Sequence, residues 1–221
     1  MKVCDALEQR KSVRAFLNKP VEKAAIVRIL NAARHAPSGT NTQPWNVAVV
    51  MGGEKQKLDT LIETEFRTRG EGKLPYNYYP VEWKEPYKSR RKACGLQLYS
   101  AVNIGREDKE KRLEQWAANY RAFDAPVVMF FFLENIMEIG SYMDYGMFLQ
   151  SIMLAAVEEG LATCPQAALG QYPELVRGEL GYTDNFTLLC GMALGYEDKD
   201  AAINQYRTPR EEVNNFTRFY G

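Results

Sequence analysis

The chain has 221 residues, of which 46% are hydrophobic and 25% are charged, and its formal net charge is zero. These values are ordinary for a globular protein and leave room for one large domain. Balanced charge gives no electrostatic argument for a nucleic-acid partner or for an acidic membrane surface. The longest apolar run, residues 125–133, contains Pro126 and is too short to span a bilayer. We therefore expect neither nucleic acid nor membrane as a partner.

The N-terminus and the cysteines indicate a cytoplasmic protein. Charged residues occupy the first positions, where a signal peptide needs an apolar core. The cysteines are widely spaced without a C-x-x-C pair, which favours free, buried thiols: Cys4, Cys94, Cys164 and Cys190. The single histidine, His35, follows Arg34 at a helix end, so a solvated surface position is favoured over a catalytic triad. No spacing suggests a metal site.

The first third of the chain predicts alternating helices and a strand. A short helix is expected over residues 3–10 and a second from Val21 to Ala33, just after Pro20. Asn46–Met51 is apolar and predicts a buried strand, broken by the glycine pair 52–53. Apolar positions from Leu58 to Phe66 recur at helical spacing and predict a helix that stops near Gly70.

Residues 70–87 have a different character, with three prolines and five aromatic residues and no periodicity. This composition predicts a long ordered loop. Loops of this length inside compact domains often line binding sites, so segment 76–87 is a candidate wall or lid over a pocket. Plain packing of a long surface loop explains the same composition equally well.

The remainder predicts a domain with few strands and many helices. Helices are expected at about 88–104 and 106–121, and the clearest strand is Val127–Leu133. Asp144–Glu159 has apolar residues on most faces, which predicts a central buried helix. A strand or loop around Pro165, a helix over 173–180 and a last strand over 186–195 precede a polar tail. No linker is visible, so one α+β domain covering residues 1–221 is predicted.

Two polar segments are candidates for a binding site. Arg10–Arg14 reads Arg-Lys-Ser-Val-Arg, and arginine offers forked donors that match phosphate oxygens. Ala36–Trp45 joins turn formers to hydroxyl and amide side chains between a predicted helix and a strand. No Walker loop appears, and no G-x-G-x-x-G follows a strand. The pair predicts a pocket for an anionic cofactor rich in hydrogen-bonding groups, with surface salt bridges as the alternative for each cation.

These two segments, in this order, resemble the opening of the FMN-dependent nitroreductase family. Leu161–Ala168 and Tyr206–Arg210 also fit, so the resemblance covers essentially the whole chain. The nitrobenzoate and nitrophenol reductase-like branch is the most similar. The resemblance implies a nitroreductase-like α+β fold, in which helices surround a central, mostly antiparallel sheet. It further implies an intertwined homodimer with two FMN sites at the subunit interface.

The resemblance also assigns roles to individual residues. The phosphate and ribityl chain of FMN would be held by Arg10, Lys11 and Ser12, with help from Arg207. Arg14 would lie near the N1 and O2 edge of the flavin ring, where a fixed cation stabilises the reduced cofactor. The ring would be lined by the segment Pro165, Gln166, Ala167 and Ala168, with a backbone N–H aimed at N5. The other subunit would contribute Pro37, Ser38, Gly39, Asn41 and Gln43.

Two further positions follow from the same resemblance. Asp144 falls where relatives make another polar flavin contact. Gln205 stands where many relatives carry a lysine close to the phosphate. The family resemblance therefore covers most, but not all, of the positions around the cofactor.

The implied activity is ping-pong hydride transfer from NAD(P)H, through FMN, to small nitroaromatic or quinone substrates. No catalytic side chain is needed, because FMN carries the chemistry and protons come from solvent. Alternatives on the same fold are a flavin-dependent reductive dehalogenase or an enoate-type reductase. A non-catalytic dimeric flavin-binding protein is a further alternative, and a purely structural role would leave the protein without flavin.

Overall fold

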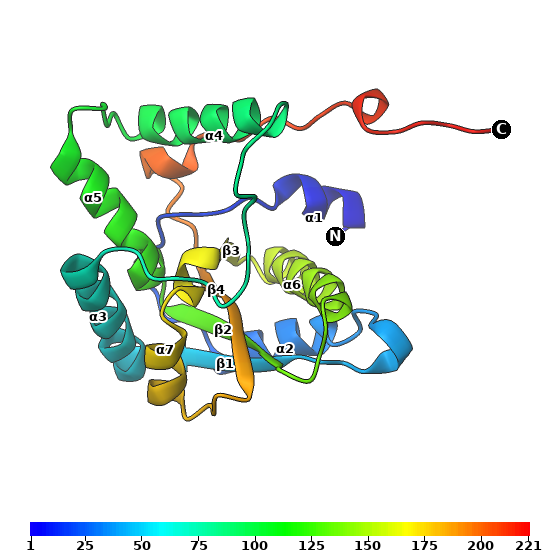
Figure 1. The fold of residues 1–221 in the computed structure, drawn as a ribbon, viewed down its shortest axis with the longest axis horizontal. Coiled ribbons are helices and arrows are strands. Elements are labelled where there is room, and N and C mark those ends of the chain that lie inside the picture. Colours follow the sequence, from blue (N-terminus) through cyan, green and yellow to red (C-terminus); the bar gives the residue numbers. More distant parts are fainter.

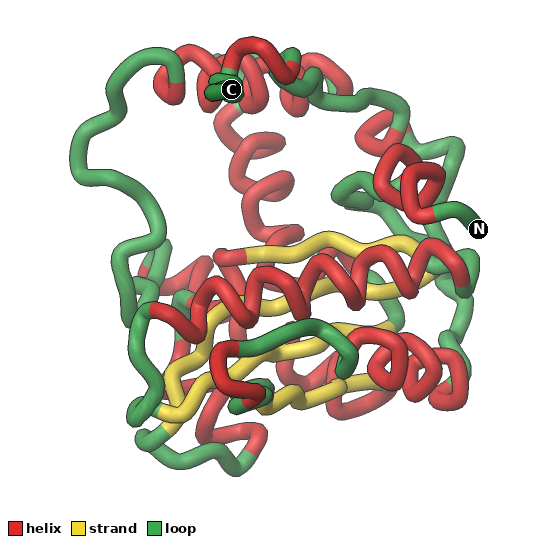
Figure 2. Tube along the Cα trace, turned by 90° about the vertical axis from the view of Figure 1, so that its right-hand side faces the viewer, coloured by secondary structure: helices red, strands yellow, loops and turns green.

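The computed structural model of the chain describes residues 1–221 and is built on a four-stranded sheet in the order β1-β2-β4-β3. Every strand pair is antiparallel. Helices lie around this sheet (Figures 1 and 2). The strands are β1 (Asn46–Met51), β2 (Val127–Glu134), β3 (Ala162–Gln166) and β4 (Phe186–Gly195). The α+β fold with a central antiparallel sheet is confirmed.

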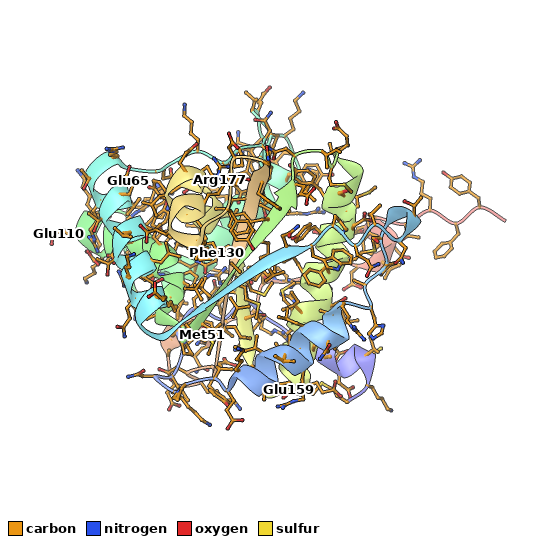
Figure 3. All side chains as sticks on the ribbon, turned by 90° about the horizontal axis from the view of Figure 1, so that it is seen from below. Met51, Glu65, Glu110, Phe130, Glu159 and Arg177 are labelled. Atoms are coloured by element: carbon orange, nitrogen blue, oxygen red, sulfur yellow. The ribbon has the colours of Figure 1, made fainter.

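Strand β2 divides the interior into two layers. Val127–Leu133 is buried along its whole length, and its side chains alternate between the two faces of the sheet. Val128 and Phe130 point into one apolar cluster, whereas Met129 and Phe131 point into the other. Figure 3 shows Phe130 in the interior. An unbroken apolar strand is what a sheet covered on both faces requires.

Each layer is closed by its own helices. The first cluster lies under α3 (Gly52–Arg69), α7 (Pro173–Leu180) and the 3₁₀ turn Ala118–Asp124. The second lies under α2 (Lys23–Ala33) and α6 (Gly140–Glu158). The sheet therefore holds α6 and its neighbours in fixed positions against β3 and β4.

The other helices lie at the periphery. They are α1 (Val3–Gln9), α4 (Tyr87–Ala101) and α5 (Lys109–Ala117). α4 buries none of its residues and runs beside the C-terminal tail, where Arg90 Nε lies 3.0 Å from Glu211 Oε1. The end of the tail projects from the body (Figure 1). No helix combines the length and the apolar character needed to cross a membrane.

Several element boundaries differ from those expected from sequence. α3 begins at Gly52, because a left-handed φ of 58° at this glycine turns the chain directly from β1 into the helix. α6 begins at Gly140 and is not buried on all sides: Met143 is 72% and Met147 is 40% exposed. These two methionines lie on the side of α6 that faces away from the sheet. α4 and α5 end earlier than predicted.

Candidate functional site

The first polar segment lies along the free edge of β3. Ser12 forms a parallel bridge with Thr163, and the Val13 amide donates to the Thr163 carbonyl over 3.0 Å. This contact satisfies backbone groups that an edge strand otherwise leaves unpaired. Segments 10–14 and 162–166, which are far apart in sequence, thus lie side by side.

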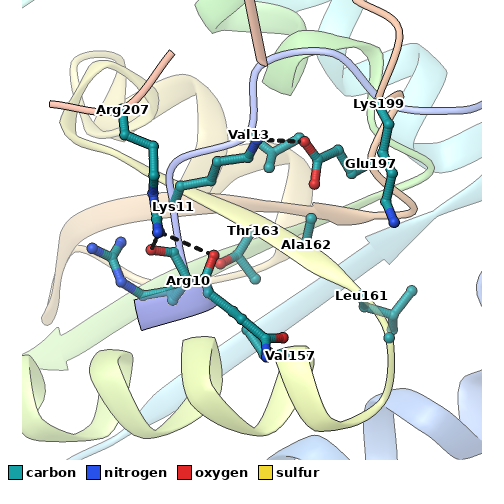
Figure 4. A pocket seen from close by; sticks show the side chains of 12 residues that line it. Arg10, Lys11, Val13, Val157, Leu161, Ala162, Thr163, Glu197, Lys199 and Arg207 are labelled. Atoms are coloured by element: carbon teal, nitrogen blue, oxygen red, sulfur yellow. Dashed lines mark hydrogen bonds and ion pairs between the residues drawn. The ribbon is translucent and has the colours of Figure 1, made fainter. Parts of the chain in front are cut away.

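Two arginines line a cavity at one end of this edge, and the charge of Arg210 acts on Arg10. Arg10 lines a cavity of about 360 Å³ together with Lys11 and Arg207 (Figure 4). The pKa of Arg10 is lowered, first by burial and then by the positive charges of Arg210 and Arg207. Guanidinium groups gathered in this way repel one another, and an anion with several oxygens relieves that repulsion. We call Arg10, Arg207 and Arg210 the arginine corner.

Carbonyl groups of this chain already accept hydrogen bonds from the Arg207 guanidinium. Its Nη2 donates to the carbonyls of Gln9 (3.1 Å) and Arg10 (2.6 Å), and its Nη1 donates to the Glu8 carbonyl. The tail is thereby tied to the end of α1. Arg10 contrasts with it, because its guanidinium makes a single contact, 4.0 Å to the sulfur of Met153 on α6.

Lys11 is also engaged by the protein. Its Nζ lies 2.7 Å from Glu197 Oε1 and donates to the Asn204 carbonyl over 2.5 Å (Figure 4). The charge of Lys11 is therefore balanced by a carboxylate. Of the cations among the sequence-predicted phosphate ligands, Arg10 is the one whose donors are free to meet an anion.

Asn204 connects the first segment to the tail. It is 2% exposed, and its Oδ1 accepts a hydrogen bond from the Arg14 amide over 2.9 Å. Its Nδ2 donates to the carbonyls of Ala15 (2.9 Å) and Asp198 (2.8 Å). We call this set of bonds the Asn204 clamp. The Arg14 guanidinium then lies 3.4 Å from the Tyr206 hydroxyl.

The end of β3 carries an unpaired buried acceptor. Gln166 is 5% exposed, and its Nε2 donates to the Asn119 carbonyl over 2.8 Å. Its Oε1 is buried without any hydrogen-bond partner. Buried polar atoms are seldom left unpaired in native proteins, because each costs about 1–3 kcal/mol. A ligand that donates a hydrogen bond here fits the structure. Ala167 and Ala168 follow in the 3₁₀ turn Ala167–Gly170.

A larger cavity of about 710 Å³ adjoins Pro165, Gln166 and Ala167. Its wall is mainly apolar and aromatic, and includes Tyr76, Tyr78 and Tyr142. Tyr76 is fixed by a 2.6 Å hydrogen bond to the Leu189 carbonyl and by an edge-on contact with Tyr142, whose ring centroid is 5.4 Å away. We call this space the aromatic cavity. Part of the loop 70–87 therefore forms the wall of a cavity.

The second polar segment, Ala36–Trp45, contacts α6 at Asp144, away from the Met153 position that Arg10 contacts. The Gly39 amide donates to Asp144 Oδ1 over 3.2 Å, and the Gln43 amide donates to Ser38 Oγ over 2.9 Å. Left-handed φ values at Thr40, Asn41 and Gln43 shape this loop, whose exposed groups include Pro37. Asp144 lies about 13 Å along the helix axis from Met153, the residue that contacts Arg10. One chain therefore does not bring this loop to the arginine corner.

Sequence reasoning missed several residues of these sites. Asn204 lies in a polar tail without periodicity, so no local pattern distinguishes it from its neighbours. In the aromatic cavity, Cys190 was predicted only as part of a strand, and Tyr142 lies outside every predicted element. His35 is exposed, as predicted.

The sequence matches known proteins over its whole length. The model of the nitroreductase family matches residues 7–196. The chain is 36% identical to a 4-nitrobenzoate reductase of Pseudomonas putida, with 96% of this chain and 92% of that protein aligned. It is also 36% identical to a nitrobenzene nitroreductase of Ectopseudomonas oleovorans, with 97% and 95% aligned.

Solved structures agree with this match. The FMN and NADPH-dependent nitroreductase NfnB from Sphigopyxis sp. strain HMH superposes with a TM-score of 0.96 at 39% identity, covering all of both chains. The FMN-dependent nitroreductase NfnB from Mycobacterium smegmatis, solved in complex with NADPH, gives a TM-score of 0.93 at 33% identity, again with full coverage.

Proposed function

The chain belongs to the nitroreductase family, and we propose that it uses FMN to pass hydride from NAD(P)H to nitroaromatic compounds. The enzyme is an FMN-dependent oxidoreductase. The observation that carries this function is the edge of β3. It has the arginine corner at one end and the unpaired Gln166 acceptor beside the aromatic cavity at the other.

The chain's own residues suit the two ends of FMN. Arg10 and Ser12 would hold the phosphate and ribityl chain, with Lys11 and Arg207 fixing the segment around them. Arg14, held by the Asn204 clamp, would place a cation against the flavin ring. FMN, when bound, supplies the hydride-accepting and hydride-donating centre. No acid–base side chain is required for this reaction.

The ring would be lined by residues Pro165–Ala168, beside the aromatic cavity. The Tyr76 and Tyr142 rings offer a flat apolar wall that suits a nitroarene or a quinone. NAD(P)H and the acceptor would use the same space in turn, which gives ping-pong kinetics. Supporting this placement, Gln166 Oε1 is left available for a hydrogen-bond donor.

Each 221-residue subunit would act as one FMN-binding domain of a homodimer. The loop with Pro37, Ser38, Gly39, Asn41 and Gln43 would reach the flavin of the partner subunit, because within one chain it lies away from the arginine corner. Met143 and Met147 expose apolar surface beside Asp144, which a second copy would cover. A cytoplasmic location suits the four free cysteines.

A visible absorbance spectrum of the purified protein tests the function directly. A bound flavin that bleaches on anaerobic addition of NADPH or NADH, and recovers with nitrobenzene, is the expected result. A flavin that stays oxidised would indicate a flavin-binding protein without this activity. Protein that lacks flavin and does not take up added FMN would refute the function.

Mixed dimers test the shared site. A heterodimer of one Arg10→Ala subunit and one Asn41→Ala subunit should have one intact site and one doubly damaged site. Two equally impaired sites would contradict the placement of the loop at the partner's flavin.

A further inference from the structure

The aromatic cavity carries a single charged group. Glu138 lines it, and no lysine, arginine or histidine does. Glu138 stands in the turn between β2 and α6, where its carbonyl accepts a hydrogen bond from the Ser141 amide over 2.9 Å. The electrostatic character of the cavity wall is therefore set by one carboxylate.

The charge of Glu138 is not balanced by the protein. Glu138 takes part in none of the ion pairs of the chain. Its side chain also acts on the cavity wall, because burial and then the negative charge of Glu138 raise the pKa of Tyr142. Tyr142 lies in the first turn of α6, shortly after Glu138, and both residues line the cavity.

Resting on the function proposed above, we propose that Glu138 determines the charge selectivity of the acceptor site, so that neutral nitroarenes are preferred over nitroarene carboxylates. An aromatic carboxylate in the cavity meets a like charge and finds no cation on its wall. Because Glu138 is exposed, water weakens this repulsion without removing it. A neutral nitroarene has no net charge, so this repulsion does not weaken its binding. Discrimination of this kind acts through an unfavourable contact with the rejected substrate.

The two kinds of acceptor are represented among the relatives. One is named for 4-nitrobenzoate and another for nitrobenzene, at the same 36% identity to this chain. Overall similarity therefore does not separate the two substrate classes.

The test compares nitrobenzene with 4-nitrobenzoate as acceptors for the FMN-loaded enzyme. Glu138→Gln should raise kcat/KM for 4-nitrobenzoate about 3-fold, and Glu138→Lys about 10-fold, with nitrobenzene nearly unchanged. Added salt should reduce the difference between the variants in kcat/KM for 4-nitrobenzoate, because it screens a partly exposed charge. A second readout is binding without turnover: benzoate should bind the variants more tightly by similar factors, and neutral benzamide should not.

Glu110→Lys is the matched control. Glu110 is exposed on α5, at the periphery of the molecule and outside the cavity wall (Figure 3), and the substitution changes the net charge equally. Glu110→Lys should leave kcat/KM for both acceptors and the affinity for benzoate unchanged. If it changes them as much as Glu138→Lys does, the effect is one of net charge and the assignment to Glu138 is wrong.

The remaining outcomes separate the two proposals. Reduction of both acceptors, with the same ratio in all Glu138 variants, would overturn the selectivity role and leave the function intact. Failure of the wild-type enzyme to reduce either acceptor would overturn the function. The benzoate and benzamide titrations would still decide the role of Glu138 in that case.

Discussion

Removing the Asn204 clamp should weaken both the fold and the cofactor site. Asn204→Ala deletes three side-chain hydrogen bonds. It leaves the Arg14 amide and the Asp198 carbonyl without partners, and the Ala15 carbonyl with only the Asp198 amide, around a residue that is 2% exposed. Nothing else in the chain is placed to satisfy the Arg14 amide. The segment that carries Arg10 and Arg14 is then held to the tail chiefly by the contacts of Arg207 and Lys11.

The magnitude follows from these bonds. Each contributes about 1 kcal/mol, and unpaired buried groups cost more, so the free energy of unfolding should fall by about 3 kcal/mol. For a chain of this length, that corresponds to a decrease in Tm of about 6–12 °C. FMN affinity should fall about tenfold, because part of the binding energy would be spent on ordering the loosened segment.

Urea unfolding of the apoprotein and titration with FMN, followed by flavin fluorescence, measure the two effects. Asn135→Ala is the matched control. Asn135 is exposed at the opposite end of β2, where it donates to the Asp184 carbonyl and accepts from the Thr187 hydroxyl, both over 2.7 Å. It should lose less than about 1 kcal/mol and retain normal FMN affinity. Equal behaviour of the two variants would refute the clamp.

Three further changes have defined outcomes. Arg10→Ala should weaken FMN binding about 10- to 100-fold with little change in Tm, since it removes a charge-assisted contact with phosphate; unchanged affinity in an FMN titration would contradict that contact. Gly191→Ala should lower Tm by about 4–10 °C in a thermal melt, because its Cβ would lie 2.8 Å from Leu169 Cβ and 2.5 Å from Leu169 Cδ1. Burial raises the pKa of Cys164 to about 11 and that of Cys190 to about 12. The unfolded chain releases these thiol protons at lower pH, so the free energy of unfolding should fall from about pH 9 upward, and replacing both cysteines by alanine should flatten this dependence in urea titrations.

Local sequence patterns were sufficient where an element depends on its own residues. The apolar run of β2 predicted a strand, and this strand is buried on both faces, whereas β1, which was predicted to be buried, buries only Val50. Pro173 and Gly181 bound α7 as their backbone preferences require, the proline at its first turn and the glycine with left-handed φ just after its end. His35 was also placed correctly by local context, and the cysteines are free as predicted, but of the four only Cys164 is buried.

Local patterns were insufficient where an element boundary or an exposed face depends on distant residues. α6 is apolar on most sides, and this predicted full burial, yet Met143 and Met147 are exposed. The helical period reports which residues are apolar, but not which neighbours are present to cover them. The glycine pair ends β1 as predicted, but α3 begins at Gly52 itself, before the apolar spacing that starts at Leu58.

The sequence by itself determined the antiparallel core, the family, and the clustering of cations at residues 10–14. Tertiary structure alone decided which of these cations is free. Lys11 is balanced by Glu197, and the Arg14 amide is held by Asn204, 190 positions away. It also decided that Glu138 stands uncompensated at the aromatic cavity. Such pairings depend on how β3, α6 and the tail are brought together, and a contact across so long a separation has no periodicity that a local pattern could record.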